Sequence, residues 1–445
     1  MSSTTSTKDV SIVSLASQIS QLSAQISSYL SVSSQPEPNF SASSIDVPET
    51  PEYEVLRAQL NDAALDLLRL INGPKSSLRS FFFTHFDLAA LQVALDRRFF
   101  AHVPLPMDVT GENIENGQKI VHGVSAAEIA EKAGMDEDRT TRVLRLLATH
   151  RIFEEVDGER GRFQHTANSA LLARDEELNA TAAMQMDELF KAASETSTLI
   201  ESSPHSSDEK HSAFYTRFGA TPYKFYEQNP QKGARFAQAM RGWSQLDRHQ
   251  VAELQNGFSW ESLKNGKVVD IGGGNGHVSI ALARQFPSLS FVVQDISTQM
   301  LSQEQGTAIQ DVEGRLTFQQ YDFFNPQPIH DANAFLIRQC LHNYNDRDCI
   351  KILRGVVPAL EQCNPGTPLL VNDVILPESG TTTRYDERHL RHVDFAMLIA
   401  FGAKQRTERE FNTLLKEADP RFEVSFSPPE FTHTYIPLSI ESPKS

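Results

Sequence analysis

The feature that most constrains the fold is the run Val268–His277, which reads VVDIGGGNGH. An apolar strand ends near Asp270, a glycine-rich turn follows, and a helical spacing of apolar residues begins at Val278. Glycines let a backbone turn sharply and approach a ligand closely, and a helix that begins there directs free N–H groups toward the turn. The next apolar strand closes on Asp295, and an acid about 20 residues beyond such a turn suits ribose hydroxyls. The run therefore predicts a site for a nucleoside-containing ligand, with a glycine-rich turn in some other α/β domain as the alternative.

The spacing of the glycines narrows the choice of ligand. The dinucleotide fingerprint G-x-G-x-x-G fails from Gly272, because His277 fills the last position, and it is only a near miss from Gly274. The alternating pattern of Asp270, Gly272, Gly274 and Gly276 is instead similar to the motif of S-adenosylmethionine-dependent methyltransferases. That ligand carries an ammonium group, which an acid such as Asp270 can help to hold. We therefore expect S-adenosylmethionine as the cofactor.

Composition and charge exclude several classes of protein. The 445 residues are 40% hydrophobic and 22% charged, which is typical of a globular protein with two or three domains. The net charge of -16 argues against nucleic acid as a main partner. Cys340, Cys349 and Cys363 have no metal-ligand spacing, and their odd number indicates a reducing compartment. With neither a long apolar span nor a secretory leader in the sequence, we expect no membrane association and a cytoplasmic location.

The first 48 residues form a serine-rich segment that ends in a proline-punctuated linker. A stripe of apolar residues at steps of three and four predicts an amphipathic helix: Ile12, Leu15, Ile19, Leu22, Ile26 and Tyr29. Serine is a mediocre helix former, so such a helix needs a surface to lie on, and we expect the dimer to provide it. Disorder with transient helix is the alternative. A mitochondrial presequence is disfavoured, because residues 1–30 contain no arginine.

Residues 49–212 are predicted to form a helical domain that contains a winged helix. Ser125 and Glu128 make a capping box, Gly134 ends that helix, and a second helix follows Asp136. A hairpin is predicted around Asp157-Gly158.

A winged helix can bind DNA or support a dimer. The second helix is basic at three positions, but acids open it and fill the wing. We therefore expect a structural or dimerisation role. The arginines are Arg139, Arg142 and Arg145, and the acids are Glu137, Asp138, Glu154, Glu155, Asp157 and Glu159.

Residues 213–445 are predicted to form an α/β domain with a Rossmann-like, mostly parallel sheet. The polar segment 203–212 precedes it, and a helical bridge is expected from Pro222 to about Gln255. Thr407 and Glu410 make a second capping box, which opens a helix to about Glu417. The expected strands are 267–271, 289–294, 315–319, 333–338, 368–373, 422–426 and 432–438, and a further helix is expected at 385–399.

Two residues follow the fourth and fifth parallel strands at the edge where ligands bind in open α/β sheets. His342 follows the fourth strand, and Asp373 closes the fifth. A phenol has a pKa near 10, so its attack on the methyl group of a sulfonium needs a base, and histidine is the usual base near neutral pH. A carboxylate such as Asp373 would orient the imidazole. A packed or capping histidine is the alternative interpretation.

The chain resembles the plant caffeate and flavonoid O-methyltransferase family, and more closely its fungal secondary-metabolism branch, over about residues 80–440. The resemblance implies a cofactor role for the motif from Asp270 to Gly276 and a ribose-binding role for Asp295. It also implies adenine contacts by Asp322 and Phe323, a basic residue near the cofactor at Arg338, the general base at His342, and flanking positions at Asp373 and Gln405.

Three positions depart from the family pattern. The family's His-Asp-Trp is His342-Asn343-Tyr344 here, one flanking Glu is shortened to Asp373, and the other is the neutral Gln405. We therefore expect either that His342 is a weaker base than in the family, or that the acceptor is an acidic phenol that needs less help to lose its proton.

The implied activity is methylation of a phenolic hydroxyl on an aromatic, polyketide-type metabolite. The resemblance implies a homodimer through the N-terminal domain, a partner that closes part of the substrate pocket, and catalysis without a metal. His389 and His392 lack the further ligands that a metal site needs. A pericyclase or isomerase that uses the bound cofactor as a fixed charge, and a winged-helix DNA-binding regulator, are the alternatives. Apolar residues around 184–186, Phe225 and Met397 are candidates for the pocket, but they do not identify the acceptor.

Overall fold

The computed structural model describes residues 10–106, 114–115, 118–119, 123–156, 158–246, 254–302, 309–424 and 433–440. Two compact units are present. The first contains Met1–Lys191, Asn229–Leu246 and Thr383–Asp386, and the second contains Ala192–Gln228, Asp247–Thr382 and Glu387–Ser445. The domain boundary between residues 212 and 213 was inferred from a polar segment rather than from contacts, and it stays a prediction.

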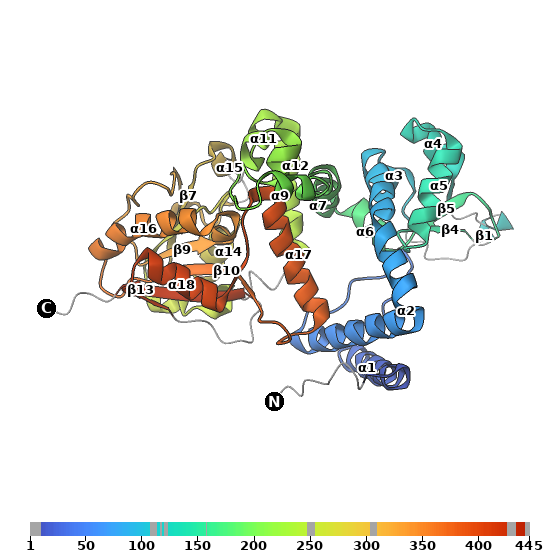
Figure 1. The fold of residues 1–445 in the computed structure, drawn as a ribbon, viewed down its shortest axis with the longest axis horizontal. Coiled ribbons are helices and arrows are strands. Elements are labelled where there is room, and N and C mark those ends of the chain that lie inside the picture. Colours follow the sequence, from blue (N-terminus) through green and yellow to red (C-terminus); the bar gives the residue numbers. More distant parts are fainter. Residues whose placement is uncertain are drawn as a thin grey trace. The chain divides into compact units, whose positions relative to one another are not determined.

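In the first unit, the serine-rich segment forms helix α1 (Ile12–Val32), which packs on α2 (Pro51–Asp96) of the same chain (Figure 1). Leu15, Leu22 and Leu30 are buried, whereas Ile12 at the start of the stripe is 49% exposed. The Tyr29 hydroxyl lies 2.6 Å from Thr50 Oγ1. The predicted amphipathic helix is therefore confirmed, and part of its apolar face packs on α2 of the same chain; the expected burial of this face against the dimer stays a prediction.

Deletion of residues 1–34 is expected to lower the melting temperature. Each buried leucine on α1 contributes about 1.5–3 kcal/mol, and the deletion exposes the facing side of α2. Differential scanning calorimetry checks this, with cofactor affinity as the control that should not change. An unchanged melting temperature would show that α1 adds nothing to stability.

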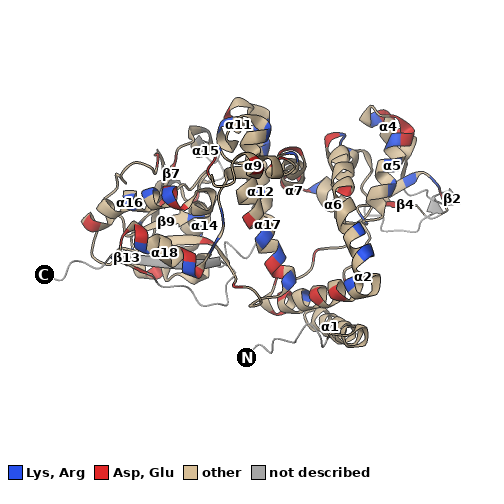
Figure 2. Cartoon of the chain, viewed as in Figure 1, with Lys and Arg blue, Asp and Glu red and all other residues tan. Residues whose placement is uncertain are grey.

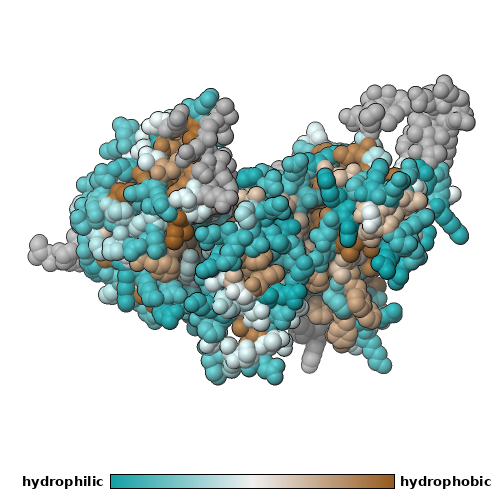
Figure 3. Space-filling model, turned by 90° about the horizontal axis from the view of Figure 1, so that it is seen from above, coloured by the Kyte–Doolittle hydropathy of each residue, from teal (hydrophilic) through white to brown (hydrophobic). Residues whose placement is uncertain are grey.

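Helix α2 bends in its middle and exposes apolar side chains beyond the bend. Gly73 has φ +65° and ψ 172°, and Pro74 cannot donate a backbone hydrogen bond to the preceding turn. This bend was not predicted from the sequence. Apolar residues reach the surface in several places (Figure 3), and those on α2 include Leu78, Phe81, Phe82, Phe83 and Phe86.

The predicted winged helix is present. Helix α4 (Ala126–Ala133) begins with the Ser125–Glu128 capping box and ends at Gly134 with φ +62°. Helix α5 (Glu137–Ala148) follows, and the strands β3 (Val124–Ser125), β5 (Arg162–His165) and β4 (Phe153–Glu155) pair in that order. The predicted turn residue Asp157 lies outside the described residues.

Acidic neighbours accompany several arginines of the winged helix. Figure 2 shows both signs of charge along α5 and the wing. Arg145 donates to Glu155 at 3.0 and 2.8 Å, Arg151 Nη1 lies 3.3 Å from Glu154, and Arg142 lies 3.9 Å from Asp138. This pairing favours a structural role over phosphate binding.

The remaining described elements of this unit are mostly helical. Helix α12 crosses α7 so closely at Gly242 that a methyl group there would lie 2.2 Å from the Glu177 carbonyl oxygen. The expected helical bridge from Pro222 to about Gln255 consists of two helices as far as Leu246, because α11 ends at Gln228 and α12 begins at Pro230; residues 247–253 lie outside the described residues. The elements are α3 (Phe99–His102), β1 (Ile114–Glu115), β2 (Gln118–Lys119), α6 (Ala167–Arg174), α7 (Glu176–Met184), a π-turn (Gln185–Leu189), α8 (Phe190–Ala193) and α12 (Pro230–Leu246).

The second unit is built on an eight-stranded sheet, in the order β12-β13-β10-β9-β6-β7-β8 with β11 beside β10. Strands β8, β7, β6, β9, β10 and β11 pair in parallel, whereas β13 and β12 pair antiparallel. The strands are β6 (Lys267–Ile271), β7 (Ser290–Asp295), β8 (Leu316–Gln320), β9 (Ala334–Arg338), β10 (Leu369–Leu376), β11 (Arg406–Thr407), β12 (Phe422–Val424) and β13 (His433–Ile440).

Alternate residues of the central strands bury opposite faces of this sheet. Val269 and Phe335 pack with α16 and α18, whereas Val268 and Leu336 pack with α14. The helices are α9 (Thr196–Ser202), α10 (Ala213–Phe218), α11 (Pro222–Gln228), α14 (His277–Gln285), α15 (Thr298–Ser302), α16 (Asp346–Gln362), α17 (Arg384–Phe401) and α18 (Glu408–Ala418), with 3₁₀ turns at Trp260–Leu263, Glu313–Arg315 and Leu341–Asn343.

The predicted α/β class and its parallel sheet are confirmed. Three of the expected parallel strands are shifted by about one residue, and β10 continues three residues beyond the expected end, to Leu376. The last two expected strands are present as β12 (Phe422–Val424) and β13 (His433–Ile440), and their expected residues 425, 426 and 432 lie outside the described residues. None of the described helices combines the length and the apolarity that a bilayer crossing requires.

Candidate active site

The glycine-rich turn follows the carboxyl end of β6, the strand that lies between β9 and β7 in the sheet. Gly272 has φ +75°, and a methyl group there would lie 3.1 Å from Cys340 Sγ and 3.4 Å from Phe323 Cε1. At Gly273 a methyl group would lie 2.5 Å from Asp270 Oδ2. The turn therefore needs glycine for close approach at both positions.

Asp270 is 2% exposed and accepts a hydrogen bond of 2.7 Å from Ser279 Oγ. Burial raises the pKa of Asp270 to about 6, although the Ser279 hydrogen bond and the Arg338 charge oppose that rise. The carboxylate would therefore be stabilised by a cation that entered the site. Ser279 thus holds this acid in place.

Asp295, at the end of β7, reaches back to the glycine turn. Its Oδ2 accepts from the Gly274 N–H at 3.0 Å, and its Oδ1 accepts from the Ser297 N–H at 2.8 Å. Burial raises the pKa of Asp295 above its usual value despite these bonds. The structure thus brings together the two acids that were predicted to contact the cofactor.

The other predicted cofactor residues follow β8 and β9. Phe323 lies beside Gly272, and its ring makes an edge contact with Tyr344 at 5.6 Å between centroids. Asp322 Oδ1 accepts from the Phe324 N–H at 3.0 Å. Arg338 ends β9, and its charge acts on Asp270.

His342 lies in the 3₁₀ turn Leu341–Asn343, directly after β9. Gln339 takes φ +45°, a conformation that is strained for a residue with a side chain, and its N–H donates to the Asn372 carbonyl at 2.8 Å. This bend turns the chain away from the sheet, so that the next residues form the turn that carries the histidine.

The imidazole of His342 contacts both of its predicted neighbours. Nδ1 lies 3.1 Å from Asp373 Oδ1 and 3.0 Å from Gln405 Nε2. Asp373 is 1% exposed; burial alone would raise its pKa, but the His342 and Arg406 charges outweigh burial and hold that pKa below the usual value. Asp373 is therefore a charged acceptor beside the ring.

This geometry determines the roles of the ring nitrogens. Nδ1 carries at most one proton, and a carboxylate can only accept, so Nδ1–H donates to Asp373 in the neutral ring. Gln405 Nε2 is the amide atom that lies beside Nδ1. The nitrogen and oxygen of an amide are assigned from hydrogen bonding, and with the two exchanged the amide oxygen accepts from the same Nδ1–H. The second nitrogen, Nε2, is then the unprotonated one, which is the arrangement that a base requires.

The length of β10 places Asp373 at this position. Asn372 is in register with Arg338, the last residue of β9, so Asp373 lies one residue beyond the end of that strand. Gln405 directly precedes β11, which pairs with Ile375 and Leu376 of β10. The two flanking residues are thus set by the register of the sheet.

Sequence reasoning missed several residues of this region. Tyr223 on α11 accepts a 3.4 Å hydrogen bond from Asn343 Nδ2, and its ring lies 5.6 Å from that of Phe401. Cys340 is buried against Gly272, and burial raises the pKa of its thiol. No local motif distinguishes either residue, because their role depends on packing between distant segments.

Two of the candidate pocket residues pack against apolar neighbours, and their place in a substrate pocket stays a prediction. Met184 is buried with Ala180 and Ala239. Phe225 packs edge-on against Phe214. Within the described ranges, no three histidine, cysteine or acidic side chains are grouped as a metal site would require.

Comparison with known proteins identifies the family. Residues 202–420 match the O-methyltransferase domain, and residues 119–175 match the O-methyltransferase dimerisation domain. O-methyltransferase sol2 of Alternaria solani is 48% identical over 93% of this chain and 92% of its own length. Chlorophenol O-methyltransferase of Trichoderma longibrachiatum is 28% identical over 85% and 78%. The crystal structure of OxaC superposes with a TM-score of 0.76 over 97% of this chain and 99% of its own, at 19% identity. The chain belongs to the family of S-adenosylmethionine-dependent O-methyltransferases.

Proposed function

We propose that the protein methylates a phenolic hydroxyl of an aromatic, polyketide-type secondary metabolite, with His342 as the general base. The observation that carries the proposal is the contact of His342 Nδ1 with the charged Asp373 at 3.1 Å, on the strand edge that also holds Asp270 and Asp295. One relative is named for a phenol, the chlorophenol O-methyltransferase, and another for a biosynthesis cluster, that of grayanic acid in Cladonia grayi.

The residues at the glycine turn fit the cofactor. S-Adenosylmethionine, when bound, supplies an electrophilic methyl group on a sulfonium. Asp295 would accept from the ribose hydroxyls, and the buried Asp270 would help to hold the ammonium. Glycines at 272 and 273 let the turn pack closely against Cys340 and Asp270, which larger residues would contact too closely.

The base and its neighbours would act on the acceptor. Nε2 of His342 would take the phenol proton, which leaves a phenolate with the electron pair for the attack. Asp373 would orient the ring and stabilise the imidazolium. Gln405 adds a hydrogen bond without a second negative charge, which suits an acceptor that loses its proton readily.

A panel of small phenols, incubated with the enzyme and S-adenosylmethionine, tests the activity by mass spectrometry. A product heavier by one CH₂ unit, together with S-adenosylhomocysteine, is the expected result. A product of unchanged mass with the cofactor intact would instead establish the pericyclase or isomerase alternative.

Replacing Gln405 with glutamate is expected to move the pH–rate profile to higher pH. The added carboxylate favours the protonated imidazolium, so the base is lost at a higher pH than in the native enzyme. Turnover at pH values above that limb should rise for weakly acidic phenols. Gln405→Leu is the control without a hydrogen bond, and an unmoved profile in Gln405→Glu would place residue 405 outside the reaction.

Cofactor affinity is expected to fall as the pH is lowered through about 6. The pKa of Asp270 is raised to about 6, so its carboxylate is present above that pH and is protonated below it. Only the anion attracts the ammonium, and affinity should fall by up to about tenfold per pH unit below the pKa. Calorimetric titrations of the native protein and Asp270→Asn check this, because the variant should lack this dependence. Equal pH dependence in both proteins would contradict the role of Asp270.

We also propose a homodimer. The dimerisation domain at residues 119–175 supports it, and so do the exposed aromatic side chains of α2, since large apolar patches commonly mark interfaces. Sedimentation equilibrium is expected to give twice the chain mass. Phe81→Glu with Phe83→Glu should shift the protein toward the monomer if α2 takes part, and a native monomer would refute the proposal.

A further inference from the structure

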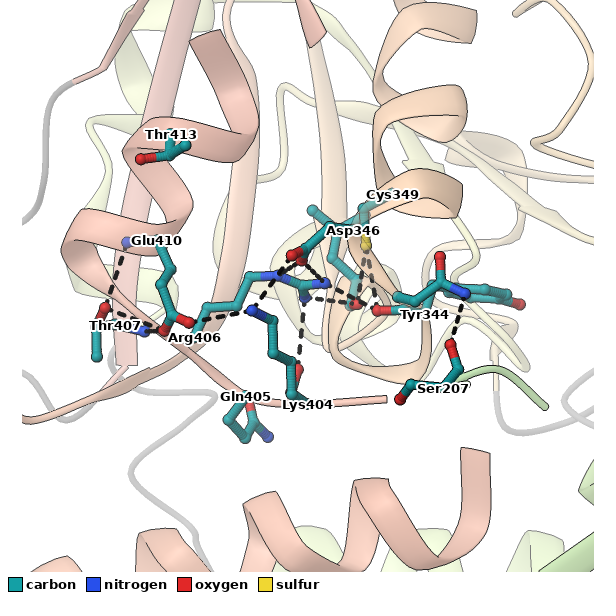
Figure 4. Close-up of polar contacts among 12 residues, drawn as sticks. Ser207, Tyr344, Asp346, Cys349, Lys404, Gln405, Arg406, Thr407, Glu410 and Thr413 are labelled. Atoms are coloured by element: carbon teal, nitrogen blue, oxygen red, sulfur yellow. Dashed lines mark hydrogen bonds and ion pairs between the residues drawn. The ribbon is translucent and has the colours of Figure 1, made fainter. Parts of the chain in front are cut away.

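A buried arginine lies next to the candidate base and contacts the turn that carries it. Arg406 is 1% exposed, and its Nη1 donates to the Leu341 carbonyl at 3.0 Å (Figure 4). Nη2 donates to the Tyr344 carbonyl at 2.9 Å. Nε and Nη2 donate to Asp346 Oδ1 at 2.9 and 2.7 Å. One guanidinium thus holds three groups that are close in sequence.

These groups enclose the histidine. Leu341 precedes His342, Tyr344 directly follows the 3₁₀ turn, and Asp346 is the first residue of α16. The thiol of Cys349 donates weakly to the Leu341 carbonyl at 3.2 Å. Arg406 therefore contacts the backbone at both ends of the turn, at Leu341 and Tyr344, and does not contact the imidazole in these hydrogen bonds.

Gln405, the residue that precedes Arg406, contacts the turn at the histidine side chain, and its own N–H donates to Asp394 Oδ1 at 2.9 Å. Figure 4 shows the side chains of Gln405 and Arg406 leaving the backbone in different directions. Arg406 also pairs with Ile375 through β11, so it is anchored to the strand that carries Asp373.

We infer that Arg406 is a positioning residue, which holds the Leu341–Asn343 turn so that Nδ1 of His342 faces Asp373 and Gln405. The inference rests on the proposed role of His342 as the base. A planar guanidinium with five donors can serve two carbonyls and a carboxylate at once, which an ammonium cannot do with the same geometry. Arg406 therefore acts through the orientation of the base and not on the substrate.

Arg406→Lys tests the inference, because it keeps the charge and loses the fork. Lys404→Met is the matched control: Lys404 Nζ lies 3.2 Å from the same Asp346 and 3.0 Å from Glu410, but its side chain has no contact with the two turn carbonyls among the described interactions. We expect kcat to fall about 10- to 100-fold in Arg406→Lys, as misplacement of a catalytic group does, with the KM for S-adenosylmethionine nearly unchanged. The control should stay within about twofold of the native enzyme.

A spectroscopic measurement separates positioning from simple stability. In histidine-labelled protein, the Nδ1–H resonance assigned by its loss in His342→Gln reports the hydrogen bond to Asp373. It should shift or broaden in Arg406→Lys and persist in Lys404→Met. If Arg406→Lys lowers only the melting temperature, with the resonance and kcat intact, Arg406 is structural and the inference is overturned.

The resonance also distinguishes this inference from the proposed function. If His342→Ala keeps full turnover, His342 is not the base, and the catalytic half of the inference falls with it. A displaced resonance in Arg406→Lys would then still show that Arg406 orients the ring, whereas an unmoved resonance would refute the orientation as well.

Discussion

His342→Ala is expected to lower kcat by about 10²–10⁴, the usual contribution of a general base. The imidazole is held by Asp373 and Gln405, so its loss removes the proton acceptor without disturbing the glycine turn. Cofactor affinity should stay nearly intact, because the described contacts of Asp295 do not involve the histidine. Single-turnover kinetics with a methylated product as the readout measures the effect on chemistry itself.

A remote histidine provides the control for this substitution. His150→Ala removes a half-exposed ring that lies 3.2 Å from Asp87 in the first unit, and it should leave kcat unchanged. If His342→Ala keeps more than about a tenth of native turnover when chemistry is rate-limiting, another base acts or the acceptor binds already ionised.

Asp295→Ala is expected to weaken S-adenosylmethionine binding by about 10- to 100-fold. The carboxylate would give charge-assisted hydrogen bonds to the ribose, which contribute about 1.5–3 kcal/mol, and a tenfold change in affinity corresponds to about 1.4 kcal/mol. The same side chain accepts from the Gly274 N–H, so the turn also loses a support. Isothermal titration calorimetry measures the loss.

Two further variants separate these contributions. Asp295→Asn keeps an acceptor for the Gly274 N–H but loses the charge, and its affinity should lie between those of the native protein and Asp295→Ala. Asp311→Ala removes an exposed acid that pairs with Arg284 at 2.8 Å, and it should bind like the native protein. Native affinity in a folded Asp295→Ala variant would mean that the ribose lies elsewhere.

Local patterns predicted the parts of the fold that depend on neighbours in sequence. The capping boxes at Ser125 and Thr407 appear as expected, because each satisfies backbone donors within one helical turn. The glycine turn after β6 was equally predictable, because an acid followed by three glycines at alternate positions is a local pattern that indicates a tight turn beside a ligand. The ends of the fourth and fifth strands predicted that Asp373 lies near His342, whereas Gln405 was predicted only from the family resemblance; the structure brings all three together.

What the sequence could not show depends on segments that meet only after folding. Leu22 predicted an apolar helix face but not that α2 would cover it. Arg406 resembles any basic residue near a helix start, and its burial became visible only when the Leu341 and Tyr344 carbonyls were placed beside it. Gly402 gives no signal in sequence, yet a methyl group there would lie 2.3 Å from the Asp208 carbonyl oxygen.

The extension of β10 beyond β9 has a consequence for how such an enzyme can change. Asp373 and the partner residues of β11 all lie on this overhang, so backbone pairing sets where the two residues that flank the histidine lie. Helices outside this backbone pairing can therefore be substituted without moving Asp373 or Gln405. Such substitutions can change which molecules bind while the geometry around His342 is kept. An insertion or deletion of one residue within Leu369–Asn372 would instead turn Asp373 to the opposite face of the sheet and end the chemistry in a single step.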